Sequence, residues 1–189
     1  MITTSTQKNN LLKDCINGNR KSQKELYDLL SPSMYSICLR YAKNQMDAED
    51  ILQNGFIKLF NNLHKFRGDG PFEGWVRRIF VNSAIELLRD KKHHIPVDLL
   101  SEHYTPVTQN LPLDNLYKKD LLKTTHLLSD GYRTVFHLYA IEGLSHKEIA
   151  EQIGISESTS KSQYSRAKAI LRNLLANKKP HKPKVGFAA

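Results

Sequence analysis

The chain has 189 residues, which is enough for one ordinary hydrophobic core or for two small ones. Hydrophobic residues make up 40% of it and charged residues 25%, a balance that is typical of a folded globular protein and excludes a disordered or fibrous one. The formal net charge of +9 favours a polyanionic partner, and nucleic acid is the leading candidate.

Apolar residues recur at helical spacing through most of the chain, and no stretch alternates apolar and polar residues for long enough to make a convincing strand. We therefore predict an all-α fold. The expected helices, in chain order, cover residues 9–28, 32–45, 47–63, 71–92, 114–128, 130–142, 145–152 and 156–176.

Residues 94–113 separate these helices into two groups. This stretch contains three prolines and neither lysine nor arginine, and proline disfavours helix at its own position and at the one before. We therefore predict two small helical domains, residues 1–93 and 114–176, joined by an extended linker. Residues 177–189 form a basic tail with four lysines and no acidic residue, for which disorder is expected.

In the first domain, the helix expected at 47–63 has an apolar stripe of Leu52, Phe56, Leu59 and Phe60. Its other side carries polar groups with modest charge, namely Gln53, Asn54, Lys58 and Asn61. Such a face can dock on another protein or simply contact solvent, and its composition alone favours solvent.

A glycine-rich loop, FRGDGPFEG, precedes the helix expected at 71–92. That helix combines Trp75, Ile79 and Phe80 with Arg77, Arg78, Asn82, Glu86 and Arg89. Aromatic faces beside cations and amides suit single-stranded DNA, because unstacked bases rest on rings or in pockets while arginines hold the backbone. The alternative is that Trp75 is a core residue, which is the commoner place for a tryptophan.

The segment from Leu144 to Leu171 has the organisation of a helix-turn-helix. Ser145 and Glu148 form a capping box for the first helix, and Ser156 caps the second. Gly154 supplies the left-handed backbone of the turn between them. The small Ala150 and the apolar Ile149, Ile153 and Ile155 fill the contact between the two helices.

The second helix of this motif has a buried stripe expected at Tyr164, Ala167, Ile170, Leu171 and Leu174. Its exposed face carries hydroxyl and cationic groups suited to base edges and phosphates, at Ser158, Thr159, Lys161, Ser162, Ser165 and Arg166. Any amphipathic helix has a polar face, but the capped, glycine-centred turn favours DNA reading over solvation. Ser160 stands where a branched apolar residue is usual, which predicts close packing with more of the burial at Tyr164.

Three segments resemble the extracytoplasmic-function (ECF) group of bacterial RNA polymerase sigma factors. These are DAEDILQNGFIKLF, FRGDGPFEGWVRRIFVNSAIELLR and GYRTVFHLYAIEGLSHKEIAEQIGISESTSKSQYSRAK, in this order within residues 10–175. The resemblance implies a sigma region 2-like domain at 1–93 and a region 4-like domain at 114–176. It also implies that the polar face of the first segment binds the clamp helices of core RNA polymerase, through Asp50, Gln53, Asn54 and Lys58.

The same resemblance assigns roles in promoter DNA. The loop at 67–74 and the following helix would melt the −10 element and hold a flipped base, through Arg67, Trp75, Arg77, Arg78, Asn82 and Glu86. The helix-turn-helix would read the −35 element as duplex, through Ser158, Thr159, Lys161, Ser162, Ser165 and Arg166. The linker would run through the polymerase active-site channel. Members of the group commonly have an anti-sigma factor, and none of these roles makes the protein an enzyme.

Cofactors and membrane insertion are not expected. Cys15 and Cys38 are too sparse for a disulfide framework or a zinc site, and buried reduced thiols are expected. His93 and His94 are adjacent without a paired ligand, so no metal site is expected. No apolar run approaches the roughly 20 residues of a spanning helix, and the N-terminal sequence lacks the apolar segment of a secretion signal, which predicts a cytoplasmic location.

Two other functions compete with this interpretation. The chain could be an autonomous helix-turn-helix regulator that dimerises through its N-terminal half and binds a palindrome without polymerase. It could also be a nuclease that uses His93 and His94 with nearby acidic residues, which predicts activity that depends on added metal.

Overall fold

The structure is a computed structural model that describes residues 5–94 and 123–177. Helices and turns account for the regular structure of these residues, and no strand occurs among them, which confirms the all-α prediction. The chain forms two compact units, one containing α1 to α4 and the other containing α6, α8 and most of α7. Apart from His94 and Asn177, the predicted linker and tail lie outside the described residues, so the domain boundaries stay predictions.

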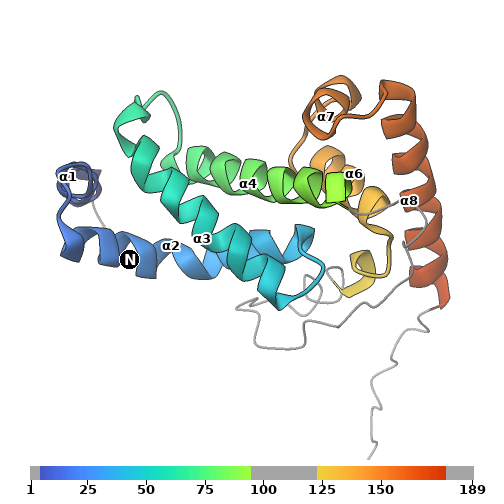
Figure 1. The fold of residues 1–189 in the computed structure, drawn as a ribbon, viewed down its shortest axis with the longest axis horizontal. Helices are drawn as coiled ribbons and strands as arrows, with labels where there is room; N and C mark the ends of the chain where they lie inside the picture. Colours follow the sequence, from blue (N-terminus) through green and yellow to red (C-terminus); the bar gives the residue numbers. More distant parts are fainter. Residues whose placement is uncertain (1–4, 95–122, 178–189) are drawn as a thin grey trace, which may run out of the picture. The chain divides into compact units, whose positions relative to one another are not determined.

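The first unit is built from α1 (Ser5–Ile16), α2 (Arg20–Tyr41), α3 (Gln45–Asn62), the short 3-10 helix η1 (Leu63–Lys65) and α4 (Phe72–His94). Helices α2, α3 and α4 pack against one another, while α1 packs on α2 and η1 (Figure 1). Their shared core includes Leu26, Ile51, Leu59, Val76 and Phe80, all almost completely buried.

Our prediction of one helix at 9–28 and another at 32–45 was wrong. The chain breaks earlier, where Gly18 has a φ of +81° and the Asn19 side chain accepts hydrogen bonds from the backbone N–H groups of Lys21 and Ser22. Helix α2 then continues through Pro32. An internal proline costs a helix about 3 kcal/mol. The buried side chains on either side of it, among them Leu30 and Met34, offset that cost by packing on the core.

The second unit contains α6 (Asp130–Ala140), α7 (His146–Ile153) and α8 (Glu157–Asn177), with α6 packed along α8. Leu128, Ala167 and Leu171 form its buried centre, flanked by Tyr132, Phe136 and Ile170. The helix predicted at 114–128 ends sooner: residues 123–125 are helical, 126–127 form a turn and 128 is a bend. Backbone bonds from Leu127 to Thr124 and from Leu128 to Thr125 tighten the chain there.

Both cysteines are free and buried, as expected. Burial raises the pKa of the Cys15 thiol to about 11 and that of Cys38 to about 12, so both are neutral thiols at physiological pH. In the described part of the chain, no group of three or more His, Cys, Asp or Glu side chains could hold a metal ion. None of the described helices is long and apolar enough to cross a membrane.

Candidate nucleic-acid interface

Helix α3 carries the residues predicted to bind polymerase. Its start is fixed by Asn44, whose side chain accepts a hydrogen bond from the Asp47 backbone N–H at 2.9 Å. Asp50, Gln53 and Asn54 are exposed, and Lys58 is half-buried. Sequence reasoning missed two apolar neighbours, Met46 and Ile57, whose side chains are 72% and 58% exposed.

These apolar residues belong to one stripe of α3. Met46, Asp50, Gln53 and Ile57 recur at spacings of three and four, so they share a side of the helix. Exposed apolar groups rimmed by polar ones mark surfaces that bind other proteins. The same spacing rule, applied to the outward face as well as to the buried one, would have found them. We name Met46, Asp50, Gln53 and Ile57 the α3 stripe.

An ion pair joins α3 to α4. The Lys58 ammonium donates a hydrogen bond to the Glu86 carboxylate, 28 residues further along the chain. Lys58 is one of the residues predicted for polymerase and Glu86 one of those predicted for the −10 strand. The fold therefore brings the two predicted surfaces together at one edge of the unit.

The loop between η1 and α4, residues 66–71, is held at its ends by three rings. Phe66 lies 5.1 Å from Phe72 and 5.4 Å from Trp75, and Phe72 and Trp75 are 6.0 Å apart, measured between ring centroids. Trp75 is half-buried in this aromatic cluster of Phe66, Phe72 and Trp75. Trp75 therefore packs within the aromatic cluster, and part of its side chain remains accessible to solvent. Arg67 and the loop residues 68–71 are exposed.

Along α4 the predicted residues do not all fall on one side. Trp75, Arg78, Asn82 and Glu86 recur at three and four residues, so they form one stripe that starts beside the loop. Arg77 comes two residues after Trp75, about 200° around the helix, and is half-buried. The structure therefore groups Arg78, Asn82 and Glu86 with the loop and places Arg77 elsewhere.

In the second unit, the predicted caps of the helix-turn-helix form as expected. The Ser145 backbone N–H donates to Glu148 Oε2 at 2.8 Å, and the Glu148 N–H donates to Ser145 Oγ at 3.2 Å. The Thr159 N–H donates to Ser156 Oγ at 3.0 Å. Gly154 turns the chain with a φ of +69°, while Ile149 and Ile153 are buried. Each cap stabilises its helix by about 1 kcal/mol.

Five of the six residues predicted to read DNA are exposed on α8, and Thr159 is half-buried. The hydroxyls of Ser158 and Thr159 lie 2.8 and 2.7 Å from Ser156 Oγ, so they gather at the helix start. Lys161 pairs with Glu157 at 2.7 Å, and Arg166 Nη1 donates to the Tyr132 hydroxyl at 3.3 Å. Lys161 and Arg166 therefore lie on the surface, and each forms one contact with a neighbouring side chain.

Ser160 is completely buried and hydrogen-bonded to His146 Nδ1 at 3.0 Å. The His146 ring also stacks on Tyr139, with centroids 4.3 Å apart, and Tyr139 in turn contacts Tyr164 at 4.4 Å. Close packing at Ser160 is thus confirmed. The expected burial of Tyr164 was wrong, because Tyr164 is only half-buried. Sequence reasoning did not foresee that a histidine of α7 would fill the space left by the missing branched side chain.

Replacing Ser160 by alanine should destabilise the protein by about 0.5–1.5 kcal/mol, because the hydrogen bond between the completely buried Ser160 hydroxyl and the half-buried His146 ring is lost. Thermal unfolding measures this loss. Ser165→Ala, an exposed serine on the same helix, is the matched control and should change stability by less than about 0.5 kcal/mol. Equal unfolding temperatures for the two variants would show that the hydrogen bond contributes nothing.

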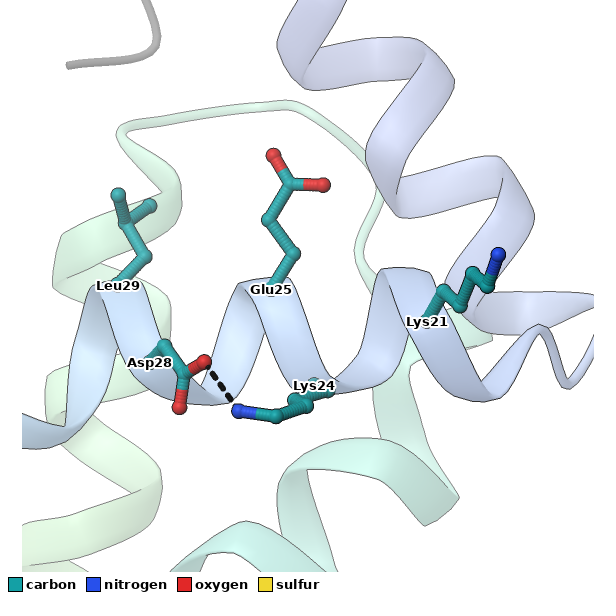
Figure 2. Close-up of a pocket in the computed structure, with 5 residues that line it drawn as sticks. All are labelled: Lys21, Lys24, Glu25, Asp28 and Leu29. Atoms are coloured by element: carbon teal, nitrogen blue, oxygen red, sulfur yellow. Dashed lines mark hydrogen bonds and ion pairs between the residues drawn. The ribbon is translucent and has the colours of Figure 1, made fainter.

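A shallow hollow lies on the surface of α2. Its lining consists of Lys21, Lys24, Glu25, Asp28 and Leu29, and Figure 2 shows them ranged along a single helix. Lys24 and Asp28 pair at 2.7 Å across one turn, and none of the predicted site residues lines the hollow.

Comparison with known proteins identifies the two units. Residues 26–94 match the family model described as Sigma-70 region 2, and residues 118–171 match the one described as Sigma-70, region 4. Together the matches cover more than half of the chain, in the expected order. The chain belongs to the ECF sigma factors.

The relatives of this sigma factor agree with that assignment. It is 32% identical over 149 residues to "ECF RNA polymerase sigma factor SigE" of Mycolicibacterium smegmatis, a match that covers 76% of this chain and 57% of the relative. With SigW of Bacillus subtilis it shares 27% identity over 87% of this chain and 94% of the relative. The chain thus spans little more than half of the first relative and nearly all of the second.

Among solved structures, the sigma factor RpoE bound to the anti-sigma factor NepR, from Bartonella quintana, aligns with a TM-score of 0.48 at 22% identity. That alignment covers 82% of this chain and 98% of the other. In this chain, the match to the Sigma-70 region 2 family model starts at Leu26, inside α2. Helix α1 therefore precedes the matched region.

Proposed function

We propose that this chain binds core RNA polymerase, carries it to specific promoters and starts transcription by reading the −35 element as duplex and opening the −10 element. The observation that carries the proposal is the presence of a region 2 match and a region 4 helix-turn-helix in one chain. A helix-turn-helix alone implies duplex DNA. The paired region 2 unit adds polymerase and an opened strand.

Polymerase docks on the α3 stripe in this proposal. Two exposed apolar side chains, Met46 and Ile57, supply area to bury, and Asp50 and Gln53 between them supply polar contacts. Asn54 and Lys58 lie at the edge of the stripe. Interfaces of this kind combine an apolar centre with a polar rim.

The −10 element is opened by the loop at 66–71 and the stripe of α4 beside it. Arg67 and Arg78 attract the phosphates, Asn82 and Glu86 offer hydrogen bonds to an unpaired base, and the exposed part of Trp75 offers a stacking face. Arg77, on another side of α4, would act from outside this stripe. Contacts with the unstacked strand offset an unpairing cost of a few kcal/mol, so opening needs no catalytic residue and we propose no enzymatic activity.

The −35 element is read by the start of α8. Its Lys161 and Arg166 suit phosphates and guanine edges, while Ser158, Ser162 and Ser165 can bond base edges or backbone. The −10 contacts and the −35 contacts each involve few residues. Joining them in one chain strengthens promoter binding only when polymerase holds both domains at the spacing of the two elements. A protein acting on polymerase and chromosomal DNA works in the cytoplasm, and an anti-sigma factor is proposed as a further partner.

Transcription in a purified system tests the proposal. Fragmented genomic DNA from the source bacterium is transcribed by core RNA polymerase with and without the chain, and the 5′ ends are sequenced. Discrete start sites that require the chain, preceded by two shared elements, are the expected result. No chain-dependent start site would contradict the proposal.

Gel shifts on the recovered fragments separate the rival regulator. Tight binding to a palindrome without polymerase, with half-sites about one helical turn apart, would favour the autonomous dimer. The sigma factor should shift these fragments specifically only together with the core enzyme. DNA cleavage that depends on added metal and is lost in His94→Ala would instead support the nuclease.

A further inference from the structure

Lys8 of α1 reaches across to the start of α4. Its ammonium donates a hydrogen bond to Glu73 Oε1 at 2.7 Å and lies 5.3 Å from the centre of the Phe72 ring. These contacts join residues 65 positions apart in the sequence. They also link a helix that precedes the region 2 match to the loop assigned above to the −10 element.

Both partners of Lys8 sit at the base of that loop. Phe72 is only 4% exposed and directly follows the loop. Its partner in the aromatic cluster, Phe66, is the first residue of the loop. A cation within about 6 Å of a ring face is attracted to it. Lys8 therefore contacts the Phe72 ring of the cluster that closes the two ends of the loop, from a helix that carries none of the proposed DNA contacts.

The second partner is a charge. Glu73 occupies the first turn of α4, and the hydrogen bond from Lys8 lowers the pKa of its carboxyl group, so Glu73 is ionised at physiological pH. Its side chain is 65% exposed beside the loop. An uncompensated carboxylate there would repel the phosphates of an approaching strand, and Lys8 cancels that charge at a distance of 2.7 Å.

Helix α1 also packs on the unit through buried apolar side chains. Leu11, Leu12 and Cys15 are buried where α1 packs on the unit, and they provide its apolar anchorage. Removing the Lys8 ammonium should therefore leave α1 docked, so that the effect on the loop can be measured separately from the fold.

We propose that Lys8 is a positioning residue for promoter opening. It fastens the aromatic cluster that closes the loop at 66–71, and it neutralises Glu73 so that the loop can receive an unpaired strand. This inference rests on the proposed −10 role of the loop and extends it to a helix outside the family match.

The test compares holoenzymes made with wild type, Lys8→Met, Lys8→Arg and Lys13→Met. Lys13 is an exposed lysine of the same helix, so its substitution makes the same change of charge. Permanganate reactivity of thymines in the −10 region is followed over time, on a promoter recovered by the transcription experiment and on a copy that is already unpaired at −10. Unfolding temperatures are measured in parallel.

Lys8→Met should slow opening about threefold to fivefold, the factor expected for one partly exposed ion pair with a cation–π contact. Lys8→Arg should open the promoter at close to the wild-type rate, and Lys13→Met should match wild type. On the template that is already unpaired at −10, Lys8→Met and wild type should no longer differ. Adding Glu73→Gln to Lys8→Met should recover part of the rate, because the uncompensated charge is gone.

Opening by Lys8→Met at the wild-type rate would overturn the inference alone. So would a loss of the same size on the unpaired template, since that places the defect in folding or polymerase binding. If the wild-type holoenzyme opened no promoter at all, the proposed function would fail, and this inference with it.

Discussion

Gly55→Ala should destabilise the first unit by about 1–3 kcal/mol, although alanine is the better helix former by about 1 kcal/mol. A Cβ at Gly55 would lie 2.5 Å from two carbons of the Phe80 ring. That ring is completely buried and meets Phe56 edge-on at 5.1 Å, so it has little room to turn away. Helices α3 and α4 must then separate, and chemical denaturation measures the cost.

Gly74→Ala is the matched control. Gly74 also lies in a helix, but apart from its chain neighbours and the adjacent backbone of that helix, no atom lies within 4 Å of the position of its Cβ. This variant should be neutral or more stable by up to about 1 kcal/mol. Combining Gly55→Ala with Phe80→Leu should cost at least about 1 kcal/mol less than the sum of the single changes, because the clashing ring carbons are gone. Equal stabilities of the two glycine variants would refute close packing at Gly55.

Signals confined to a few neighbouring residues were readable from the sequence. The caps at Ser145 and Ser156 and the turn at Gly154 each depend on residues within four positions, and the structure has them as predicted. The break before α2 was predicted too late, between residues 28 and 32, whereas the structure has it at Gly18 and Asn19. A proline favours the first turn of a helix, yet burial of the surrounding apolar side chains decided its place.

Contacts between residues far apart could not be predicted in the same way. Lys58 and Glu86 were assigned to different partners, and only the packing of α3 on α4 shows that they pair. Periodicity likewise says which side of α7 is buried, but not that His146 meets Ser160 across 14 residues. The outward stripe of α3 was available from spacing alone, because Met46 and Ile57 stand in register with Asp50 and Gln53.

Replacing both Lys161 and Arg166 by alanine should lower transcription from a −35-dependent promoter about 10-fold to 100-fold. Both side chains are exposed on the first turns of α8, and a good contact to a base or phosphate is worth about 1–3 kcal/mol. The ion pair between Lys161 and Glu157 is exposed to solvent and therefore weak, so the Lys161 ammonium can readily bind a phosphate instead. Arg166 is directed by the Tyr132 hydroxyl without being buried.

Single-round transcription on the native promoter and on one with a scrambled −35 element measures this loss. The double variant should fall to the level that wild type reaches on the scrambled promoter, and scrambling should then have little further effect on it. Arg172→Ala removes a cation from the same helix beyond its first turns, where Arg172 is exposed, and should leave transcription unchanged. Two results would contradict this prediction. The double variant could lose as much activity relative to wild type on the scrambled promoter as on the native one, or Arg172→Ala could lose as much activity as the double variant. Either result would mean that α8 contributes general positive charge and does not read the −35 element.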